Sequence, residues 1–347
     1  MTQPAVRTAE EVDRAALDRF LRKAYSPEKA TFLEKHGGWW HRGQHNRWVI
    51  EDGGEVAAYC AVIPTAVQVF GERVDAAWWV DLVVDSNYRG EGLQRALDEK
   101  VRAAAPLIVG FPNALAARIH RRHGWGVRED LEVRLLPLRP TEMVRTRASA
   151  GLVGAGLRLS ALLVAPAARI FSRRLERFEP RWARVLDRPS AEALAEVFDR
   201  NWDAEVTTTF RDAEYLAWRY LEAPYRNELF VVVGGEGESP DVVTVIRVMR
   251  RGKGNVARVL DLFGALSEPE MVSDVLSLAA KHALTLGACQ LTALSANQAI
   301  SDSLRAAGFV VRTGARFCWT FGGRDLHSRI EGSFLHLALG DSDNDEP

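Results

Sequence analysis

The predicted helices and strands occur in the same order twice along the chain, and this internal repeat constrains the fold more than any other feature. Asn113 is followed eleven and twelve residues later by Gly124-Trp125. Asn297 is followed at the same spacing by Gly308-Phe309, 184 residues further on. Self-similarity at a fixed offset is the signature of a duplicated unit. The sequence therefore predicts a tandem duplication.

A second marker of the repeat is an aspartate-leucine pair, Asp81-Leu82, which recurs as Asp261-Leu262 at an offset of 180 residues. The chain has 347 residues, 47% hydrophobic and 26% charged, so each copy is long and apolar enough to bury its own core. The net charge of -1 provides no overall field that would attract nucleic acid or an anionic membrane. We therefore expect two globular domains that do not bind nucleic acid.

The boundaries of these domains follow from the repeat. We expect an N-terminal domain over 1–140, a linker helix within 141–180 and a C-terminal domain over 181–347. The linker contains an apolar stretch, Ala150–Ile170, that approaches the length of a membrane span but includes two arginines and a proline. A linker helix packed on the domains is the first interpretation, and a helix resting on a membrane surface is the alternative.

Cysteine usage and the N-terminus bear on the compartment. The three cysteines, Cys60, Cys289 and Cys318, are too few and too scattered for a disulfide framework, and no pair has the spacing of a zinc site. The first twenty residues carry charges every few positions and no apolar core, unlike a signal peptide. We expect a cytoplasmic protein without a bound metal.

Hydrophobic patterning predicts a mixed α/β (α+β) sheet flanked by helices in each half. The elements expected in the first half are a helix Ala9–Ala24, strands Trp48–Ile50, Val56–Val62, Val67–Phe70 and Ala76–Val84, a helix Gly92–Ala104, a strand Leu107–Phe111, a helix Ala114–His123 and a strand Glu132–Pro137. The same order follows from about residue 181. The strand Ala76–Val84 is almost entirely apolar, as expected for a strand covered on both faces.

The sharpest local signal is Arg89-Gly90-Glu91-Gly92, which lies between this buried strand and the next helix. Two glycines let the backbone turn so that successive N–H groups and the helix N-terminus point at one place, an arrangement suited to a pyrophosphate. A plain strand-to-helix turn is the alternative. The G-x-G-x-x-G fingerprint of dinucleotide folds is absent.

The order of helix, hairpin, strand, R-G-x-G turn, helix, strand, Asn, helix and Gly-aromatic resembles the GNAT superfamily of acyl-CoA-dependent acyltransferases. The resemblance covers roughly residues 10 to 138, with a weaker copy over about 181 to 325. In that family the pattern Q/R-x-x-G-x-G/A forms the pyrophosphate loop. Arg89 and Gly92 match its first two fixed positions, whereas Gln94 stands where the family prefers Gly or Ala, a departure that could crowd the loop.

The resemblance implies an acetyl-CoA site. The N–H groups of the loop would bind the diphosphate of coenzyme A, and the backbone of the preceding strand would pair with the pantetheine arm like an added strand. The residues that this implies for cofactor binding are Leu82, Val83, Val84, Arg89, Gly90, Glu91, Gly92, Leu93, Gln94 and Asn113.

Two residues are the candidates for catalysis. The family pattern after the asparagine has a tyrosine at +7 that commonly protonates the leaving thiolate, and here His120 stands at that position. As an imidazolium, His120 would be a competent general acid, whereas an exposed histidine in a basic helix is the alternative. Asp81 is the only carboxylate in its apolar strand, so burial would raise its pKa toward that of a useful base. A salt-bridged structural aspartate is the alternative.

The second half lacks the R-x-x-G-x-G pattern. Its corresponding loop, 264–270, holds a proline and two acids where N–H groups are required, and Leu304 matches His120. We expect this half to form a wall of the substrate site rather than to bind coenzyme A.

These observations predict an enzyme that transfers an acetyl group from coenzyme A to a primary amine of a small molecule or sugar, by direct attack in a ternary complex. Backbone N–H groups near Val83 and Val84 would stabilise the oxyanion. Two alternatives are a Fem-like transferase that takes aminoacyl groups from tRNA and a non-catalytic sensor that binds acyl-CoA. The loop argues against the first, because it is suited to a diphosphate.

Overall fold

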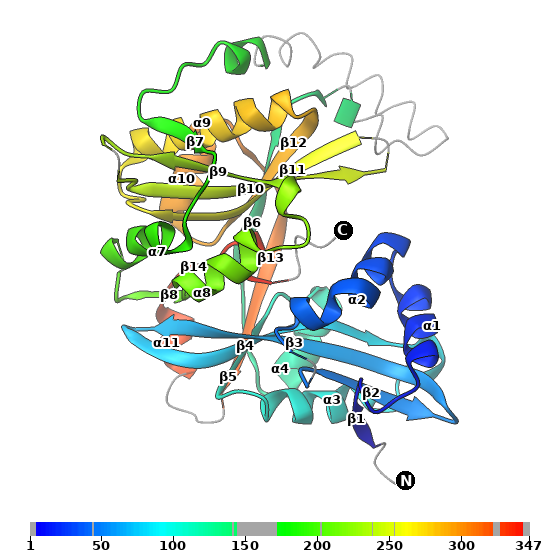
Figure 1. Cartoon of the computed structure of the whole chain (residues 1–347). Helices are drawn as coiled ribbons and strands as arrows, with labels where there is room; N and C mark the ends of the chain where they lie inside the picture. The colour runs from blue at the N-terminus through cyan, green and yellow to red at the C-terminus, as the bar shows by residue number, and fades with distance from the viewer. Residues whose placement is uncertain are drawn as a thin grey trace.

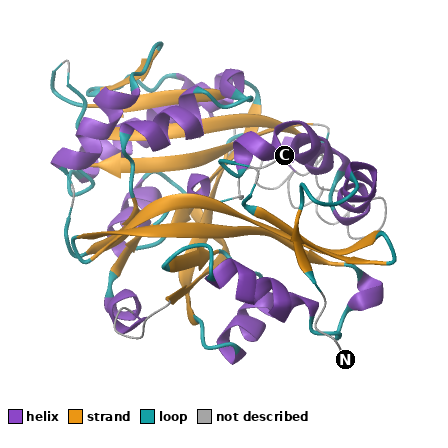
Figure 2. Cartoon of the chain, turned by 60° about the horizontal axis from the view of Figure 1, so that its bottom comes forward, coloured by secondary structure: helices purple, strands orange, loops and turns teal. Residues whose placement is uncertain are grey.

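The computed structural model describes residues 5–43, 45–140, 142–143, 172–201, 203–237, 239–252, 254–321 and 327–342. Within them the strands form one mixed sheet with helices on both faces (Figures 1 and 2). The predicted fold class is therefore confirmed. The apolar segment Ala150–Ile170 lies outside the described residues. None of the helices in these ranges is long and apolar enough to cross a membrane.

The first half follows the predicted order with three additions, which are a short first strand, a second helix near the N-terminus and a 3-10 turn before the glycine loop. Its elements are β1 Val6–Thr8, α1 Arg14–Ala24, α2 Pro27–Trp40, β2 Arg47–Asp52, β3 Glu55–Val69, β4 Glu72–Val84, the short 3-10 turn η1 Ser86–Tyr88, α3 Leu93–Arg102, β5 Leu107–Gly110, α4 Ala114–Arg122 and β6 Gly126–Pro137. Ser26 begins α2, because its side chain accepts a hydrogen bond from the Lys29 N–H and Pro27 stands at the first helical position. The strand predicted at Val67–Phe70 is the end of β3.

The second half repeats this order and adds short elements. They are β7 Ala183–Leu186, α7 Ala191–Arg200, β8 Val206–Thr209, α8 Ala213–Leu216, the π-helical turn η2 Ala217–Leu221, η3 Arg226–Glu228, β9 Leu229–Gly234, β10 Val242–Arg251, β11 Gly254–Gly264, α9 Pro269–Thr285, β12 Ala288–Ser295, α10 Gln298–Ala306, β13 Val310–Phe321, α11 His327–Gly332, β14 Phe334–His336 and η4 Leu339–Asp341.

The two halves exchange strands. The sheet order is β1-β2-β3-β4-β5-β13-β6-β12-β11-β10-β9-β7, so β13 of the second half lies between β5 and β6 of the first, and β6 pairs with β12. In Figure 1, β6 and β13 run between the lower and upper halves. β13 therefore belongs to the second half in sequence but lies within the sheet of the first half in space. The strand that covers the free edge of β5 comes from the far end of the chain. The domain limits themselves stay a prediction.

A single hydrophobic core extends across both halves. It lies between the sheet and the helices α1 and α2 in the first half, and between the sheet and α7, α8 and η2 in the second. Across it the indole N–H of Trp218 donates to the carbonyl of Trp39 at 3.0 Å. Helices α3 and α9 cover the opposite faces through separate apolar clusters. The shared core fixes the first half against the second.

The C-terminal strap, which we define as residues 334–342, connects the halves a second time. Its strand β14 pairs with β8, and β8 pairs with β3 of the first half. Two buried arginines hold the rest of the strap. Arg219 donates from Nε to the Gly340 carbonyl at 2.7 Å, and Arg211 Nη2 lies 3.3 Å from Asp341 Oδ1. The strap is therefore anchored by strand pairing and by charge.

Candidate active site

β4 and β5 form the parallel pair from which the site is built. They are paired from Ala76 to Trp78 and then separate, so the last part of β4 leaves one backbone edge open. The register between β3 and β4 shifts just beyond this point, which marks a β-bulge. Asp81 lies in the bulge with a φ of 58°. This left-handed conformation is uncommon for a residue other than glycine, so the surrounding contacts must hold it.

The glycine loop follows the open strand directly. Gly90 and Gly92 have φ values of 92° and 82°, which only glycine adopts without strain. Gly92 begins α3 without a side-chain cap, so no side-chain oxygen takes up the first N–H groups of the helix. The open edge of β4 and the positive end of α3 therefore meet at one place.

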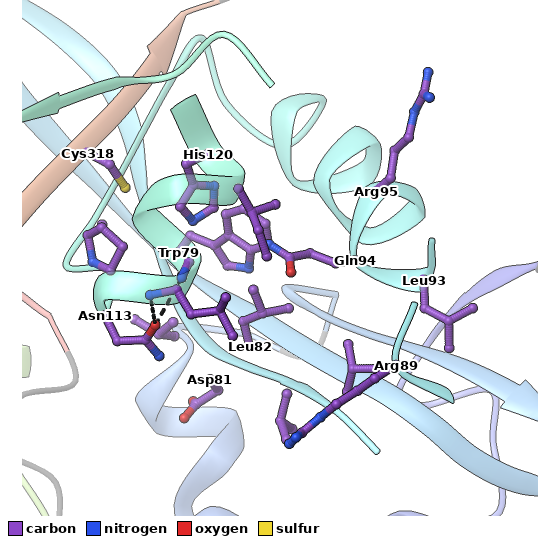
Figure 3. A pocket seen from close by; sticks show the side chains of 18 of the residues that line it. Trp79, Asp81, Leu82, Arg89, Leu93, Gln94, Arg95, Asn113, His120 and Cys318 are labelled. Carbon is purple, nitrogen blue, oxygen red and sulfur yellow. Dashed lines mark hydrogen bonds between the residues drawn. The ribbon is translucent and has the colours of Figure 1, made fainter. Parts of the chain in front are cut away.

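A cavity of about 930 Å³ joins these two features (Figure 3). Every residue that the sequence assigned to cofactor binding lines it except Glu91, and so do Asp81 and His120. Asn113 begins α4 at the opposite wall, where its side chain accepts hydrogen bonds from the N–H groups of Leu115 and Ala116. The structure thus brings the predicted residues to one cleft.

The charge state of Asp81 differs from the expectation. Its side chain is fully buried, with Lys29 Nζ 2.7 Å from Oδ1 and His41 Nε2 2.9 Å from Oδ2. Burial by itself raises the pKa of this carboxyl, but the Lys29 charge and the His41 hydrogen bond outweigh it and lower the pKa from 3.8 to about 2. The expectation of a raised pKa is therefore wrong. A carboxylate this acidic is a poor proton acceptor near neutral pH.

His120 is also not in the expected state. It is buried against Trp79 and Trp125, with ring centroids 5.1 Å and 4.5 Å away, so it is not an exposed histidine of a basic helix. Burial, with smaller effects of His123 and Arg102, lowers its pKa from 6.5 to about 4. The prediction that His120 is an imidazolium is therefore wrong at neutral pH. His120 presents a neutral ring to the cleft.

Three residues of this site escaped the sequence analysis. Tyr25, Lys29 and His41 all lie at the ends of or within α1 and α2, and the first two line the cavity. The Tyr25 hydroxyl donates to the Asp81 backbone carbonyl at 2.6 Å. Because a buried aspartate requires a counter-charge, the sequence did indicate that a cation would lie near Asp81. Spacing along the chain does not say which residue supplies that cation.

The second half has the same separated strand pair, but the gap where the two strands diverge, which we call the notch, is filled. β11 and β12 pair as far as Arg258 and Thr292 and then diverge. His336, Leu337 and Ala338 of the C-terminal strap occupy the notch, leaving a gap of about 10 Å³. The notch residues correspond in order to cavity residues of the first half: Val259 to Trp79, Leu262 to Leu82, Ala293 to Gly110, Leu294 to Phe111, Ile300 to Ala116 and Leu304 to His120.

The outer part of this second cleft stays open. It is a cavity of about 520 Å³ between the loop after β11 and the start of α10, where Asn297 corresponds to Asn113. The loop has no counterpart of the glycine pair, and Glu268 stands before the first helical residue of α9. The open part therefore lacks the anion-binding amides of the first half.

The site therefore combines a separated parallel strand pair, a bulge at its opening and a glycine loop before a helix. Residues 5–128 match the family model for the acetyltransferase (GNAT) domain. This match lies within the range over which the sequence motifs resemble the GNAT superfamily. No curated protein matches the sequence.

Solved structures share the fold over nearly the whole chain. An N-myristoyltransferase from Saccharomyces cerevisiae with bound myristoyl-CoA has a TM-score of 0.63 at 11% identity, covering 93% of this chain and 84% of its own. A GCN5-related N-acetyltransferase from Anabaena variabilis has a TM-score of 0.57 at 15% identity, covering 91% and 73%. A probable N-acyltransferase from Enterococcus faecalis has 0.59 at 11%, covering 94% and 74%. At these identities the likeness is one of fold.

Proposed function

We propose that the protein transfers an acetyl group from coenzyme A to a primary amine of a small molecule, by direct attack in a ternary complex. The observation that carries this proposal is the continuous cavity that joins the open edge of β4 to the amides of the glycine loop. An extended chain with amides at one end and a diphosphate at the other matches this arrangement, and coenzyme A has that chemistry.

Cofactor binding would use backbone groups. Leu82, Val83 and Val84 would pair with the amides of the pantetheine arm as an added strand. The N–H groups from Gly90 to Gln94 would bind the diphosphate, helped by the N-terminal end of α3. Because these interactions are local, they are compatible with a near-neutral protein.

The chemistry is one exchange of bonds. The neutral amine nitrogen attacks the thioester carbonyl carbon, the carbon–sulfur bond breaks, and the proton that the nitrogen loses on forming the amide is balanced by the one that the leaving coenzyme A thiolate takes up. Backbone N–H groups near Val83 and Val84 would stabilise the oxyanion. His120 would donate a hydrogen bond from its neutral ring to the leaving sulfur, since it lines the cleft and its ring is held in place by Trp79 and Trp125.

We further propose that the first half alone binds coenzyme A. The support is the contrast between the open cavity of the first half and the filled notch of the second, which are lined by corresponding residues. The second half would instead support the first through β13 and the shared core.

Calorimetry with a matched pair of variants tests cofactor binding. Gly92→Asp places a negative charge in the loop, whereas Gly53→Asp places the same residue at another positive-φ glycine, in the β2–β3 turn away from the cavity. We expect Gly92→Asp to weaken acetyl-CoA binding by at least about thirtyfold, because a charge beside a phosphate is repelled. Gly53→Asp should bind as wild type does.

Product analysis then separates the candidate activities. The wild-type protein is incubated with acetyl-CoA and a panel of amines, and in parallel with myristoyl-CoA and with aminoacyl-tRNA. Amide formation from acetyl-CoA supports the proposal. Faster transfer from myristoyl-CoA would indicate a long-chain acyltransferase, transfer from aminoacyl-tRNA a Fem-like enzyme, and binding without transfer or hydrolysis a sensor.

A further inference from the structure

Asp81 is held by residues of the N-terminal helical segment. Lys29 and His41 contact its carboxylate, and Tyr25 donates to its backbone carbonyl. All three come from α1, α2 or the residues that follow them. Figure 3 shows Asp81 and His120 at opposite ends of the site, with Trp79 and Leu82 between them. The carboxylate thus belongs to the packing between β4 and α2.

The accessibility of the carboxylate argues against a role in proton transfer. The Asp81 side chain has 0% of its surface exposed, and the Lys29 side chain that covers it has 17%. An acceptor amine would have to displace Lys29 before reaching the carboxylate. That displacement would break the Lys29–Asp81 ion pair inside the protein, which costs free energy. A base for the reaction must be within hydrogen-bond reach of its proton.

The second half supplies an internal comparison. Asp261 lies three residues beyond the last paired residue of β11, as Asp81 does in β4, and again next to a register shift. Arg211 Nε lies 2.9 Å from both of its oxygens, and the Tyr220 hydroxyl donates to it at 3.0 Å. A buried aspartate, a cation and a tyrosine therefore recur at a bulge whose notch is filled by the chain itself.

We propose that Asp81 is a positioning residue, which with Lys29 and His41 pins the strained bulge of β4 so that the backbone from Leu82 to Val84 faces the cleft. It neither takes a proton from the acceptor nor contacts the cofactor. The inference deepens the proposed function and rests on it, since it explains how the pantetheine-binding edge is shaped. The observation behind it is that in the second half, too, a buried aspartate beside a register shift is paired with a cation, Arg211, although no open notch lies next to it.

Calorimetry and kinetics on a double-mutant cycle test this role. Asp81→Asn should weaken acetyl-CoA binding by about tenfold to a hundredfold, because a misplaced edge loses several contacts together. Adding Lys29→Met should restore part of that loss, since it removes a largely buried cation whose carboxylate partner has been lost. The pH dependence of kcat in Asp81→Asn should keep the wild-type shape.

A general base gives the opposite pattern. Unchanged affinity in Asp81→Asn, with a loss of kcat, an altered pH profile and no rescue by Lys29→Met, would overturn the proposal. Asp261→Asn is the matched control. It removes the equivalent carboxylate in the second half and should leave the affinity for acetyl-CoA unchanged, with any effect confined to the melting temperature.

A failure of the variant to fold, or of the proposed function itself, can be told apart from a failure of this proposal. If Asp81→Asn does not fold, Tyr25→Phe removes only the hydroxyl that donates to the Asp81 carbonyl, and it should weaken acetyl-CoA binding by about threefold to tenfold, as expected for one hydrogen bond. Wild-type affinity in Tyr25→Phe would then overturn the proposal. Failure of the wild-type protein to bind acetyl-CoA would instead refute the proposed function.

Discussion

His336 donates a hydrogen bond from Nε2 to the backbone carbonyl of Leu262 at 2.7 Å. Leu262 occupies the position in the second half that Leu82 occupies at the open edge of β4 in the first. The C-terminal strap therefore uses a backbone group of the kind that we assign to the cofactor in the other half. The strap thus occupies the place in the second half that a bound cofactor would need, so a second cofactor molecule should not bind there.

We expect wild-type protein to bind one acetyl-CoA per chain in calorimetric titration. Gly92→Asp should remove this binding without revealing a second site, because the strap blocks the inner end of the second cleft. Leu337→Ala, which shortens a buried strap residue, should lower the free energy of unfolding by about 2–4 kcal/mol and leave the affinity unchanged. Two sites in the wild-type protein would contradict this assignment.

The neutral state of His120 predicts a specific kinetic defect. His120→Phe keeps the aromatic packing against Trp79 and Trp125 but removes the ring nitrogens. We expect kcat to fall by roughly a hundredfold with little change in acetyl-CoA affinity, as for loss of a group that assists the leaving thiolate. His282→Phe is the control, since that ring packs on Phe230 in the second half. A fully active His120→Phe protein would remove His120 from the mechanism.

Gln94 is predicted to assist binding rather than to crowd the loop. It lines the cavity, and its Nε2 is buried without a hydrogen-bond partner among the described residues. An acceptor on the cofactor would satisfy this donor, so Gln94→Ala should weaken acetyl-CoA binding by about threefold to tenfold. The exposed Gln298, which bonds only Asp302 among the described side chains, supplies the control Gln298→Ala. Tighter binding by Gln94→Ala would show that the side chain crowds the loop.

The buried His120 and the half-buried His336 make stability depend on pH. Burial lowers the pKa of both His120 and His336 from 6.5 to about 4. The unfolded chain therefore binds protons that the folded chain excludes as pH falls from about 6.5 to 4, and stability is full above this window and lost within it. Each histidine contributes a slope of at most about 1.4 kcal/mol per pH unit.

Denaturant unfolding between pH 7 and pH 4 measures this slope. The double variant His120→Gln/His336→Gln, whose amide can still donate to Leu262, should have a flatter dependence than the wild-type protein over that range. Equal slopes in the two proteins would show that neither histidine is buried in the neutral form. Below pH 4 the Asp81 carboxylate adds a further loss, because its lowered pKa makes it stabilising only while it is ionised.

Much of the fold could be predicted from local patterns. The apolar strand ending at Val84, the glycine pair of the loop and the helix after Asn113 each depend on residues within a few positions of one another, so β4, the turn and α4 were predicted near their observed limits. Helix α2 was missed, although Ser26 and Pro27 carry the signal for its start.

The sequence by itself determined the repeated order of elements, the glycine loop between β4 and α3, and many of the residues that line the cleft. Only the tertiary structure decided that β13 crosses into the first half, that the strap fills the second notch and that Asp81 is paired with Lys29. The reason is the range of the interactions. Backbone preferences act over a few residues, whereas a pKa and a filled cavity depend on groups that packing brings together from distant parts of the chain.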